Sequence, residues 1–452
     1  MLTHEHNELL CRVEGNAPMG QLMRRHWQPA CMIEEVPEAD GKPVRVKLFG
    51  EDLVAFRDTT GRVGVIGEFC PHRRASLVYG RNEECGLRCL YHGWKMDVGG
   101  NVVAMPSEPE ESRMLGKARH VAYPTREAGG LVWVYMGPPE TMPEFEAPAF
   151  APTPDSKVAI VKVIVHCNWA QILEGAIDSA HSSSLHSTDI PAGSGDQTTA
   201  AGGVWSRPTA DKSPRIQVQR TNYGFRYAAI RRPINDAATK DYIRITTFVA
   251  PNTVLIPPNN LYSLVNVNVP MDDTDTAFYF IAWSNWGPGV DTEAFREFCG
   301  AQVGIDLDHT YRRLRNRDND YWQDRNAMKH GDYTGMKGIP NQDMAMWETM
   351  GPIADRSRER LGASDIAIVQ FRRIMVDAVQ RFASGEPAIG TTDPHIPHGE
   401  LRSFEGIVPK TTNWRTLGAS ETELALLAKG NETKPDAGAA QAASPAARAA
   451  TY

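Results

Sequence analysis

The chain has 452 residues, of which 41% are hydrophobic and 23% charged, and its formal net charge is −7 at pH 7. This length allows two or three domains with a large buried core. Positive and negative residues are mixed along the chain without basic blocks, so a nucleic-acid partner is not expected.

The sequence predicts a cytoplasmic protein. It contains no apolar run of about 18 residues or more, and its N-terminal segment lacks the basic and apolar regions of a signal peptide. The seven cysteines are an odd number, and only two of them stand in a metal-ligand pattern. A disulfide framework is therefore not expected.

The first third of the chain predicts a small all-β domain. Residues 1–25 carry a weak helical pattern and form a helical lead-in, and residues 26–137 contain short β-like runs separated by turn signals. Residues 138–156 are rich in Pro, Glu and Ala, which is typical of a linker.

Two ligand pairs lie inside this β-rich region: Cys70-Pro-His72 and, after sixteen intervening residues, Cys89-Leu-Tyr-His92. Two thiolates on one iron and two imidazoles on the other are the ligand set of a Rieske [2Fe-2S] cluster. Structural zinc sites also use Cys and His, but they usually pair C-x-x-C or H-x(3–5)-H. Cys85 is left out, because it does not complete a C-x-x-H pair. We expect both ligand loops to be hairpin tips, where side chains can converge on a metal.

The remainder of the chain predicts an α+β domain over residues 157–428. Alternating runs at 157–165 and between 215 and 283 are joined in part by short turns, which favours an antiparallel sheet. Helical sequence follows at 292–329 and 341–382. The Ala-, Gly- and Pro-rich residues 429–452 predict a disordered tail.

A second metal site is indicated by a helical segment that begins at Asn168. Asp178 and His181 are three residues apart, which places them on one face of a helix. His181 and His186 are five apart, so the helix must end or distort between them, and the serines between them make that easy.

Two histidines and one carboxylate form the facial triad of non-haem Fe(II) oxygenases. The carboxylate chosen is Asp343, at the predicted start of a helix, and Asp355 and Asp365 are its rivals. Two nearby histidines are more often ordinary packing residues. Beside a Rieske motif, however, the cluster needs an electron acceptor, and the metal site is favoured.

Together these motifs resemble the Rieske non-haem iron ring-hydroxylating oxygenases across both principal domains. The patterns on which the resemblance rests are C-P-H-R, C-x-Y-H-G-W and N-W-x(4)-E-x(3)-D-x-x-H-x(4)-H. The segment from Glu174 to His186 and the block Asn341-Gln-Asp343 are similar to the phthalate 4,5-dioxygenase group, which acts on aromatic acids.

The resemblance implies a fold and an assembly. A Rieske β domain is joined to a catalytic domain with a large antiparallel sheet gripped by helices, and subunits pack head to tail as homotrimers or homohexamers. Asp178 matches the carboxylate that bridges a cluster histidine of one chain to an iron histidine of the next. From the residues alone, Asp178 also suits a partner of His181 or His186 that fixes the ring orientation.

The resemblance also implies an activity. NADH reduces a separate flavin- and ferredoxin-type reductase, and electrons pass through the cluster to Fe(II) held by His181, His186 and Asp343. Both atoms of the co-substrate O2 are added to phthalate, which gives the cis-4,5-dihydrodiol.

An aromatic acid of this kind needs cationic groups, and the arginine fork matches a carboxylate. Alternation on the strand from Tyr242 places Arg244 on one face with Thr246 and Phe248. Arg207, which follows a Gly-rich stretch, is the second candidate. Weaker candidates in the same sheet are Arg220, Arg226, Arg231 and Arg232.

Two other functions remain open from the sequence. One keeps the same metals and acts on another aromatic acid (chlorobenzoate, sulfobenzoate, isophthalate or phenoxybenzoate), in some cases as a monooxygenase or demethylase. The other is an electron carrier that uses only the Rieske centre. The carrier leaves His181 and His186 without a role.

Overall fold

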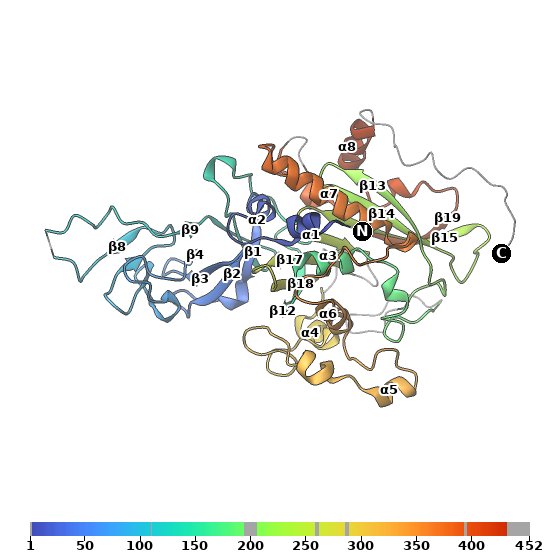
Figure 1. The fold of residues 1–452 in the computed structure, drawn as a ribbon, viewed down its shortest axis with the longest axis horizontal. Coiled ribbons are helices and arrows are strands. Elements are labelled where there is room, and N and C mark those ends of the chain that lie inside the picture. The colour runs from blue at the N-terminus through green and yellow to red at the C-terminus, as the bar shows by residue number, and fades with distance from the viewer. Residues whose placement is uncertain are drawn as a thin grey trace.

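The computed structural model describes residues 2–109, 111–193, 206–257, 262–284, 289–392 and 396–431. A small β-rich part projects from a larger body built around one sheet (Figure 1). The N-terminal helices are α1 (His4–Cys11) and α2 (Pro18–Met23), and both pack against α7 (Ile366–Ala383) of the larger body. Within the described ranges, no helix is long and apolar enough to span a bilayer.

The projecting part consists of three small antiparallel sheets with strand orders β1-β11-β10, β2-β3-β4-β9 and β5-β6-β7-β8. Val54, Phe56 and Ile66 are fully buried in an apolar cluster that also contains Cys70 and Cys89. The predicted all-β architecture is confirmed. The strands are β1 Gln28–Met32, β2 Val44–Leu48, β3 Glu51–Arg57, β4 Val63–Gly67, β5 Arg81–Glu83, β6 Gly86–Arg88, β7 Lys95–Met96, β8 Val102–Ala104, β9 Ala122–Tyr123, β10 Thr125–Ala128 and β11 Leu131–Val134.

The larger body is built on an eight-stranded antiparallel sheet. Its order is β12-β18-β17-β16-β15-β14-β13, and β19 pairs with β15. Helices α3 (Trp169–Ala176), α4 (Thr292–Cys299) and α7 pack against these strands, as predicted for a sheet gripped by helices. The strands are β12 Lys157–Val165, β13 Arg215–Thr221, β14 Gly224–Arg231, β15 Lys240–Val249, β16 Thr253–Ile256, β17 Ser263–Pro270, β18 Thr276–Ser284 and β19 Phe404–Pro409.

The predicted helical regions 292–329 and 341–382 are wrong as continuous helices. Gly300 adopts a left-handed conformation (φ 61°) and ends α4. Pro352 follows α6 closely and cannot continue it. Of the predicted tail, residues 432–452 lie outside the described residues, and α8 extends to residue 431. The remaining helices are α5 Arg325–Lys329, α6 Ile339–Thr349 and α8 Glu421–Asn431.

Buried polar contacts join the two parts. The ammonium group of Lys162 on β12 lies 2.7 and 2.9 Å from the two carboxylate oxygens of Glu35, and both side chains are less than one-tenth exposed. The side chain of Asn252 donates to that of Gln28 at 2.8 Å. Because a buried charge is strongly destabilising without its partner, the ion pair holds the two parts in one relative orientation.

Candidate metal centres and active site

The two cysteine–histidine pairs lie on loops of the projecting part. Cys70 and His72 follow β4, and Cys89 and His92 lie in the turn between β6 and β7. The second loop is a hairpin tip, as the sequence predicted. The first loop is also closed as an antiparallel turn, by a bridge between Phe69 and Ser76, although β4 and the next strand, β5, belong to different sheets.

The second loop is held in a tight turn. Gly93 adopts φ +73°, and a Cβ atom there would come within 2.6 Å of the Pro106 ring, so glycine is required at this position. The amide of Cys89 donates to the carbonyl of Trp94 at 2.8 Å. The Trp94 ring in turn stacks on His72, with centroids 4.7 Å apart and planes at 7°.

The four side chains fit a Rieske cluster. Both thiols are buried, and burial together with the neighbouring Cys89 raises the pKa of Cys70 to about 11. The rings of His72 and His92 have centroids 4.4 Å apart. Nδ1 of His72 is buried and has no hydrogen-bond partner among the described residues. A buried ring nitrogen without a partner, beside a second imidazole, is the arrangement that a metal ligand requires.

The segment that carries Asp178, His181 and His186 differs in secondary structure from the prediction. Asn168 caps α3, and its side chain accepts from the amide of Ala170 at 3.1 Å. The expectation that one helix carries Asp178 and His181 is wrong, because α3 ends at Ala176. The Asp178 carboxylate accepts from the main-chain amide of Ala180 at 2.7 Å and so stabilises a new turn.

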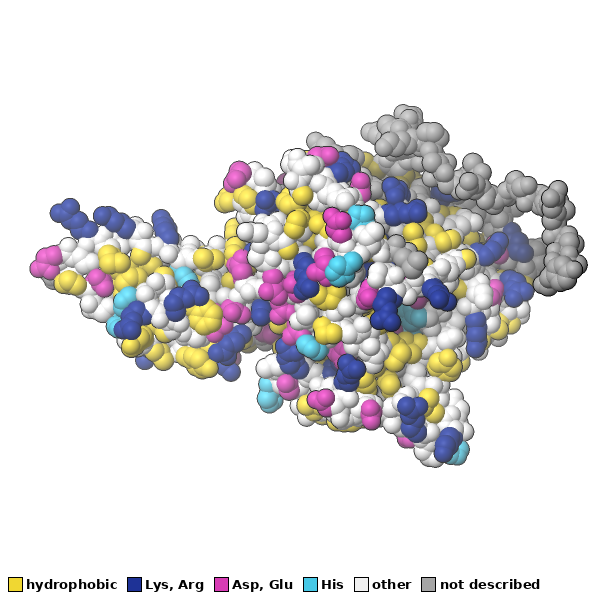
Figure 2. Space-filling model, in the orientation of Figure 1, with side chains coloured by type: hydrophobic (Ala, Val, Ile, Leu, Met, Phe, Trp, Pro, Cys, Tyr) yellow, Lys and Arg dark blue, Asp and Glu magenta, His cyan; other side chains and the backbone are white. Residues whose placement is uncertain are grey.

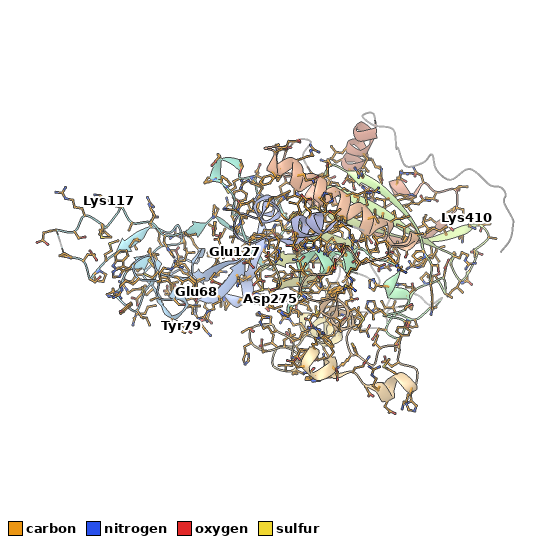
Figure 3. The ribbon with its side chains drawn as sticks, in the orientation of Figure 1. Glu68, Tyr79, Lys117, Glu127, Asp275 and Lys410 are labelled. Carbon is orange, nitrogen blue, oxygen red and sulfur yellow. The ribbon has the colours of Figure 1, made fainter. Side chains whose placement is uncertain are left out.

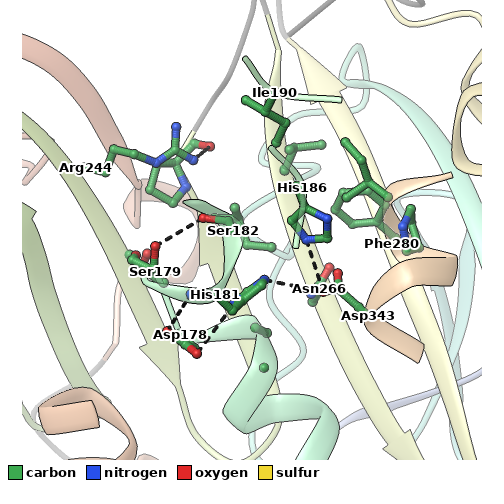
Figure 4. A pocket seen from close by; sticks show the side chains of 18 of the residues that line it. Asp178, Ser179, His181, Ser182, His186, Ile190, Arg244, Asn266, Phe280 and Asp343 are labelled. Atoms are coloured by element: carbon green, nitrogen blue, oxygen red, sulfur yellow. Dashed lines mark hydrogen bonds and ion pairs between the residues drawn. The ribbon is translucent and has the colours of Figure 1, made fainter. Parts of the chain in front are cut away.

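Three predicted metal ligands converge behind this turn. Oδ1 of Asp343, on α6, lies 3.3 Å from Nε2 of His181 and 3.1 Å from Nε2 of His186. The donor atoms of the three residues all lie within 4.8 Å of one another (Figure 4). A two-histidine, one-carboxylate set of this size fits a mononuclear iron.

The rival carboxylates are occupied elsewhere. Asp355 accepts from Ser357, and Asp365 accepts from the amide of Gly362, each within its own turn. The structure therefore brings only Asp343, among these three candidates, to the histidine pair.

The carboxylates at the triad stabilise positive charge, which favours a bound metal cation there. Although burial opposes ionisation, the two imidazoles lower the pKa of Asp343. Although burial also opposes a charged His181, Asp178 and Asp343 raise its pKa to about 10. Nδ1 of His181 lies 3.6 Å from Asp178, and Nδ1 of His186 lies 2.7 Å from Oε1 of Gln342. The sequence prediction missed Gln342, although it stands next to Asp343.

A pocket opens beside the triad. Its apolar wall is formed largely by Ile190, Ile256, Leu264, Phe278, Phe280 and Trp347. Both predicted substrate arginines line it as well. Arg244 on β15 donates to Glu405 at 2.6 Å and to the carbonyl of Pro257 at 3.2 Å, and Arg207 donates to the hydroxyl of Ser182 at 2.7 Å.

The weaker arginine candidates differ in position. Arg231 lies against the turn that follows α3 and donates to the carbonyl of Ser179 in that turn at 2.6 Å. Arg226 donates instead to main-chain carbonyls near β19, and Arg232 is exposed and pairs with Asp211. Arg220 is exposed on β13.

Comparisons with known proteins agree with this geometry. Residues 26–123 match the family model described as Rieske [2Fe-2S] domain, and residues 134–437 match the model described as LigXa C-terminal domain like. The chain is 65% identical to the phthalate 4,5-dioxygenase oxygenase subunit of Pseudomonas putida, over 93% of this chain and 95% of the relative. The chain belongs to the Rieske non-haem iron aromatic-ring oxygenases.

More distant relatives of this chain match over a similar length. The 3-chlorobenzoate-3,4-dioxygenase oxygenase subunit of Comamonas testosteroni is 36% identical over 91% of this chain and 96% of its own. The solved structure of the Pseudomonas putida CBB5 NdmA QL mutant with caffeine has a TM-score of 0.57 at 19% identity, and covers 81% of this chain and 94% of that one. This last likeness supports the fold alone.

Family membership confirms the predicted cofactors and the enzyme class. As a Rieske oxygenase, the protein uses a Rieske [2Fe-2S] cluster, a mononuclear iron and O2. It acts on an aromatic substrate and receives electrons from a reductase. The assignment of individual ligands rests on the geometry described above.

We expect His181→Ala to lose the mononuclear iron and to keep the cluster. The substitution removes one of three donors, whereas the cluster loops lie in the projecting part. Iron analysis combined with visible absorption of the cluster measures both. The matched control is His166→Ala, because that ring is exposed and pairs with Asp275. Unchanged iron content in His181→Ala would contradict the assignment and favour an electron carrier.

Proposed function

We propose that this chain is the oxygenase component of a phthalate 4,5-dioxygenase. It adds both atoms of O2 to phthalate and forms the cis-4,5-dihydrodiol. The 65% identical relative that carries this name supports the proposal. The structural observation that carries it is the charge of the pocket region, where three buried guanidinium groups lie together.

The arginine side of the pocket, opposite Asp343, has an excess of positive charge (Figure 4). Arg207, Arg231 and Arg244 are at most 8% exposed, and Glu405 pairs with Arg244. Nε of Arg207, and Nε and Nη1 of Arg231, are buried without a hydrogen-bond partner in the described parts of the chain. Burial, with Arg244 close by, lowers the pKa of Arg207 to about 9, which leaves it cationic at neutral pH. Because unpaired buried charge is costly, the region favours a dianionic ligand such as an ortho-dicarboxylate.

The layout of the pocket supports the proposed position of attack. In Figure 4, Arg244 lies on the opposite side of the pocket from Asp343 and Phe280. The carboxylates of phthalate occupy ring carbons 1 and 2, so the edge of carbons 4 and 5 is the opposite edge of the ring. An acid anchored at the arginines therefore directs this edge toward the iron ligands.

When bound, the cluster supplies single electrons and the mononuclear iron supplies dioxygen activation. The protein's own residues bind the metal, orient the substrate and exclude water. His181, His186 and Asp343 provide the donor atoms that would hold the iron. The arginines bind the carboxylates of the acid and so orient its ring. The apolar residues Leu264, Phe278 and Phe280 contact the ring and exclude water.

We propose that Asp178 links neighbouring chains in a head-to-tail homotrimer or homohexamer. Its carboxylate is 21% exposed and lies beside His181, so its outer edge is accessible to a cluster histidine, His72 or His92, of another chain. Lys or Arg and Asp or Glu side chains both lie at the free end of the projecting part, where Lys117 lies, so this end can pair with charges on a neighbouring chain (Figures 2 and 3).

We propose an NADH-dependent reductase with flavin and a plant-type ferredoxin centre as the electron donor. His72 and His92 are half-buried near the surface of the cluster domain, which suits one-electron transfer from such a centre. The cytoplasmic location stays a prediction.

Single-turnover product analysis tests the proposed function without the reductase. Chemically reduced protein mixed anaerobically with phthalate and then with O2 is expected to give the phthalate cis-4,5-dihydrodiol by mass spectrometry. Conversion of 3-chlorobenzoate or another substituted benzoate, with no product from phthalate, would contradict the substrate assignment and retain the enzyme class.

We expect Arg207→Met to raise the KM for phthalate by about 10- to 100-fold, because a hydrogen bond to a charged group contributes about 1.5–3 kcal/mol. Steady-state kinetics measures the change. Arg244 is less suitable for substitution in this test, because its removal leaves Glu405 buried without its salt-bridge partner. The control is Arg215→Met, since that side chain is exposed on β13. A KM equal to that of the wild type would exclude Arg207 from substrate binding.

We expect Asp178→Asn to keep both metals but to lower coupled product formation by about 10- to 100-fold, in line with other partners of metal-bound histidines. The amide preserves the shape and removes the charge that faces His181. Product formed per O2 consumed measures the coupling. Normal coupled turnover in this variant would contradict the bridging role.

A further inference from the structure

The side chain of Gln342 connects the two chain segments that supply the candidate iron ligands. It lies on α6 next to Asp343 and is 1% exposed. Its Oε1 lies 2.7 Å from Nδ1 of His186. Its Nε2 lies 2.7 Å from Oδ2 of Asp189 and 2.9 Å from the carbonyl oxygen of Met336.

These contacts determine which way the amide faces. A carboxylate oxygen and a carbonyl oxygen both accept hydrogen bonds, so the group that faces Asp189 and Met336 must be the donor NH2. The oxygen of Gln342 must therefore face His186. An amide oxygen only accepts, so the neutral His186 ring carries its hydrogen on Nδ1.

The proton position decides which ring nitrogen can bind a metal. With the hydrogen on Nδ1, the lone pair of His186 is on Nε2, and that atom lies 3.1 Å from Asp343 at the donor cluster. The reversed amide would place the NH2 group against Nδ1 and favour the hydrogen on Nε2. That tautomer cannot bind iron through Nε2.

The second histidine has a looser contact, an ion pair with Asp178 in place of a hydrogen bond. Nδ1 of His181 lies 3.6 Å from Asp178 and is buried without a hydrogen bond in the described structure. His186 is thus the ligand whose ring is fixed from within the chain. His181 is the ligand whose ring is less tightly held.

We infer that Gln342, itself oriented by Asp189, is a positioning residue that fixes the tautomer and ring orientation of His186 for iron binding. This inference rests on the iron site of the proposed function. Asp189 and His186 belong to one short segment, so the same bonds also hold that segment against α6.

The test compares Fe(II) affinity in the full-length protein with its cluster intact, by anaerobic competition with a chelator. Gln342→Met keeps the length of the side chain and removes its hydrogen bonds. We expect the Fe(II) dissociation constant to rise about 10- to 100-fold. The visible spectrum of Co(II) bound at the same site is expected to change with it.

Two further variants sharpen the result. Asp189→Asn allows the amide to reverse, while Met336 still opposes the reversal, so we expect a smaller loss of affinity than in Gln342→Met. Asn341→Leu is the matched control, because Asn341 is also a buried amide on α6 but donates to the carbonyls of Gly300 and Lys337. It should lower thermal stability and leave Fe(II) affinity unchanged.

The outcomes distinguish failure of the positioning role of Gln342 from failure of the proposed function. Wild-type Fe(II) affinity and an unchanged Co(II) spectrum in Gln342→Met would overturn the positioning role alone. An equal loss of affinity in Asn341→Leu would also overturn it, since general destabilisation would then account for the effect. Absence of mononuclear Fe(II) binding in the wild type would overturn the proposed function together with this inference.

Discussion

The convergence of a partly buried carboxylate and two imidazoles on one point organises the metal site of the catalytic domain. Asp343 is ionised despite its burial because His181 and His186 face it, and the three residues come from two distant segments. Glu174, on the helix before the histidines, is likewise buried but pairs with Arg356 and Arg372. The segment that carries the histidines is thus fixed at several points by charge pairs in a low-dielectric interior.

The register of the large sheet decides where the pocket charges lie. Ala229 pairs with Arg244 and Arg231 pairs with Tyr242 in the β14–β15 ladder, so both arginines point to the same face. A slip of one residue between these strands would turn one arginine to the opposite face. The antiparallel pairing brings together cationic groups from neighbouring strands, and in the proposed function these groups select the substrate.

Much of the site could be predicted because its information is local. The spacing of Cys70, His72, Cys89 and His92, and of His181 and His186, matches known ligand patterns within short loops. The end of α3 was missed, since it depends on Asp178 capping a following turn rather than on periodicity. Partners such as Gln342 and Glu405 depend on tertiary pairing, and sequence spacing carries no signal for them. The breaks after α4 and α6 were also not expected, although Gly300 and Pro352 are local signals that could have placed them.

The buried pair of Lys162 and Glu35 fastens the cluster domain to its own catalytic domain, and that domain projects outward (Figure 1). In this orientation the cluster domain points away from the catalytic domain of its own chain (Figure 1). In the proposed assembly, electron transfer then becomes a property shared between subunits. A chain with a damaged cluster and a chain with a damaged iron site would each supply what the other lacks. Mixed assemblies of two inactive proteins would therefore contain working pairs of centres.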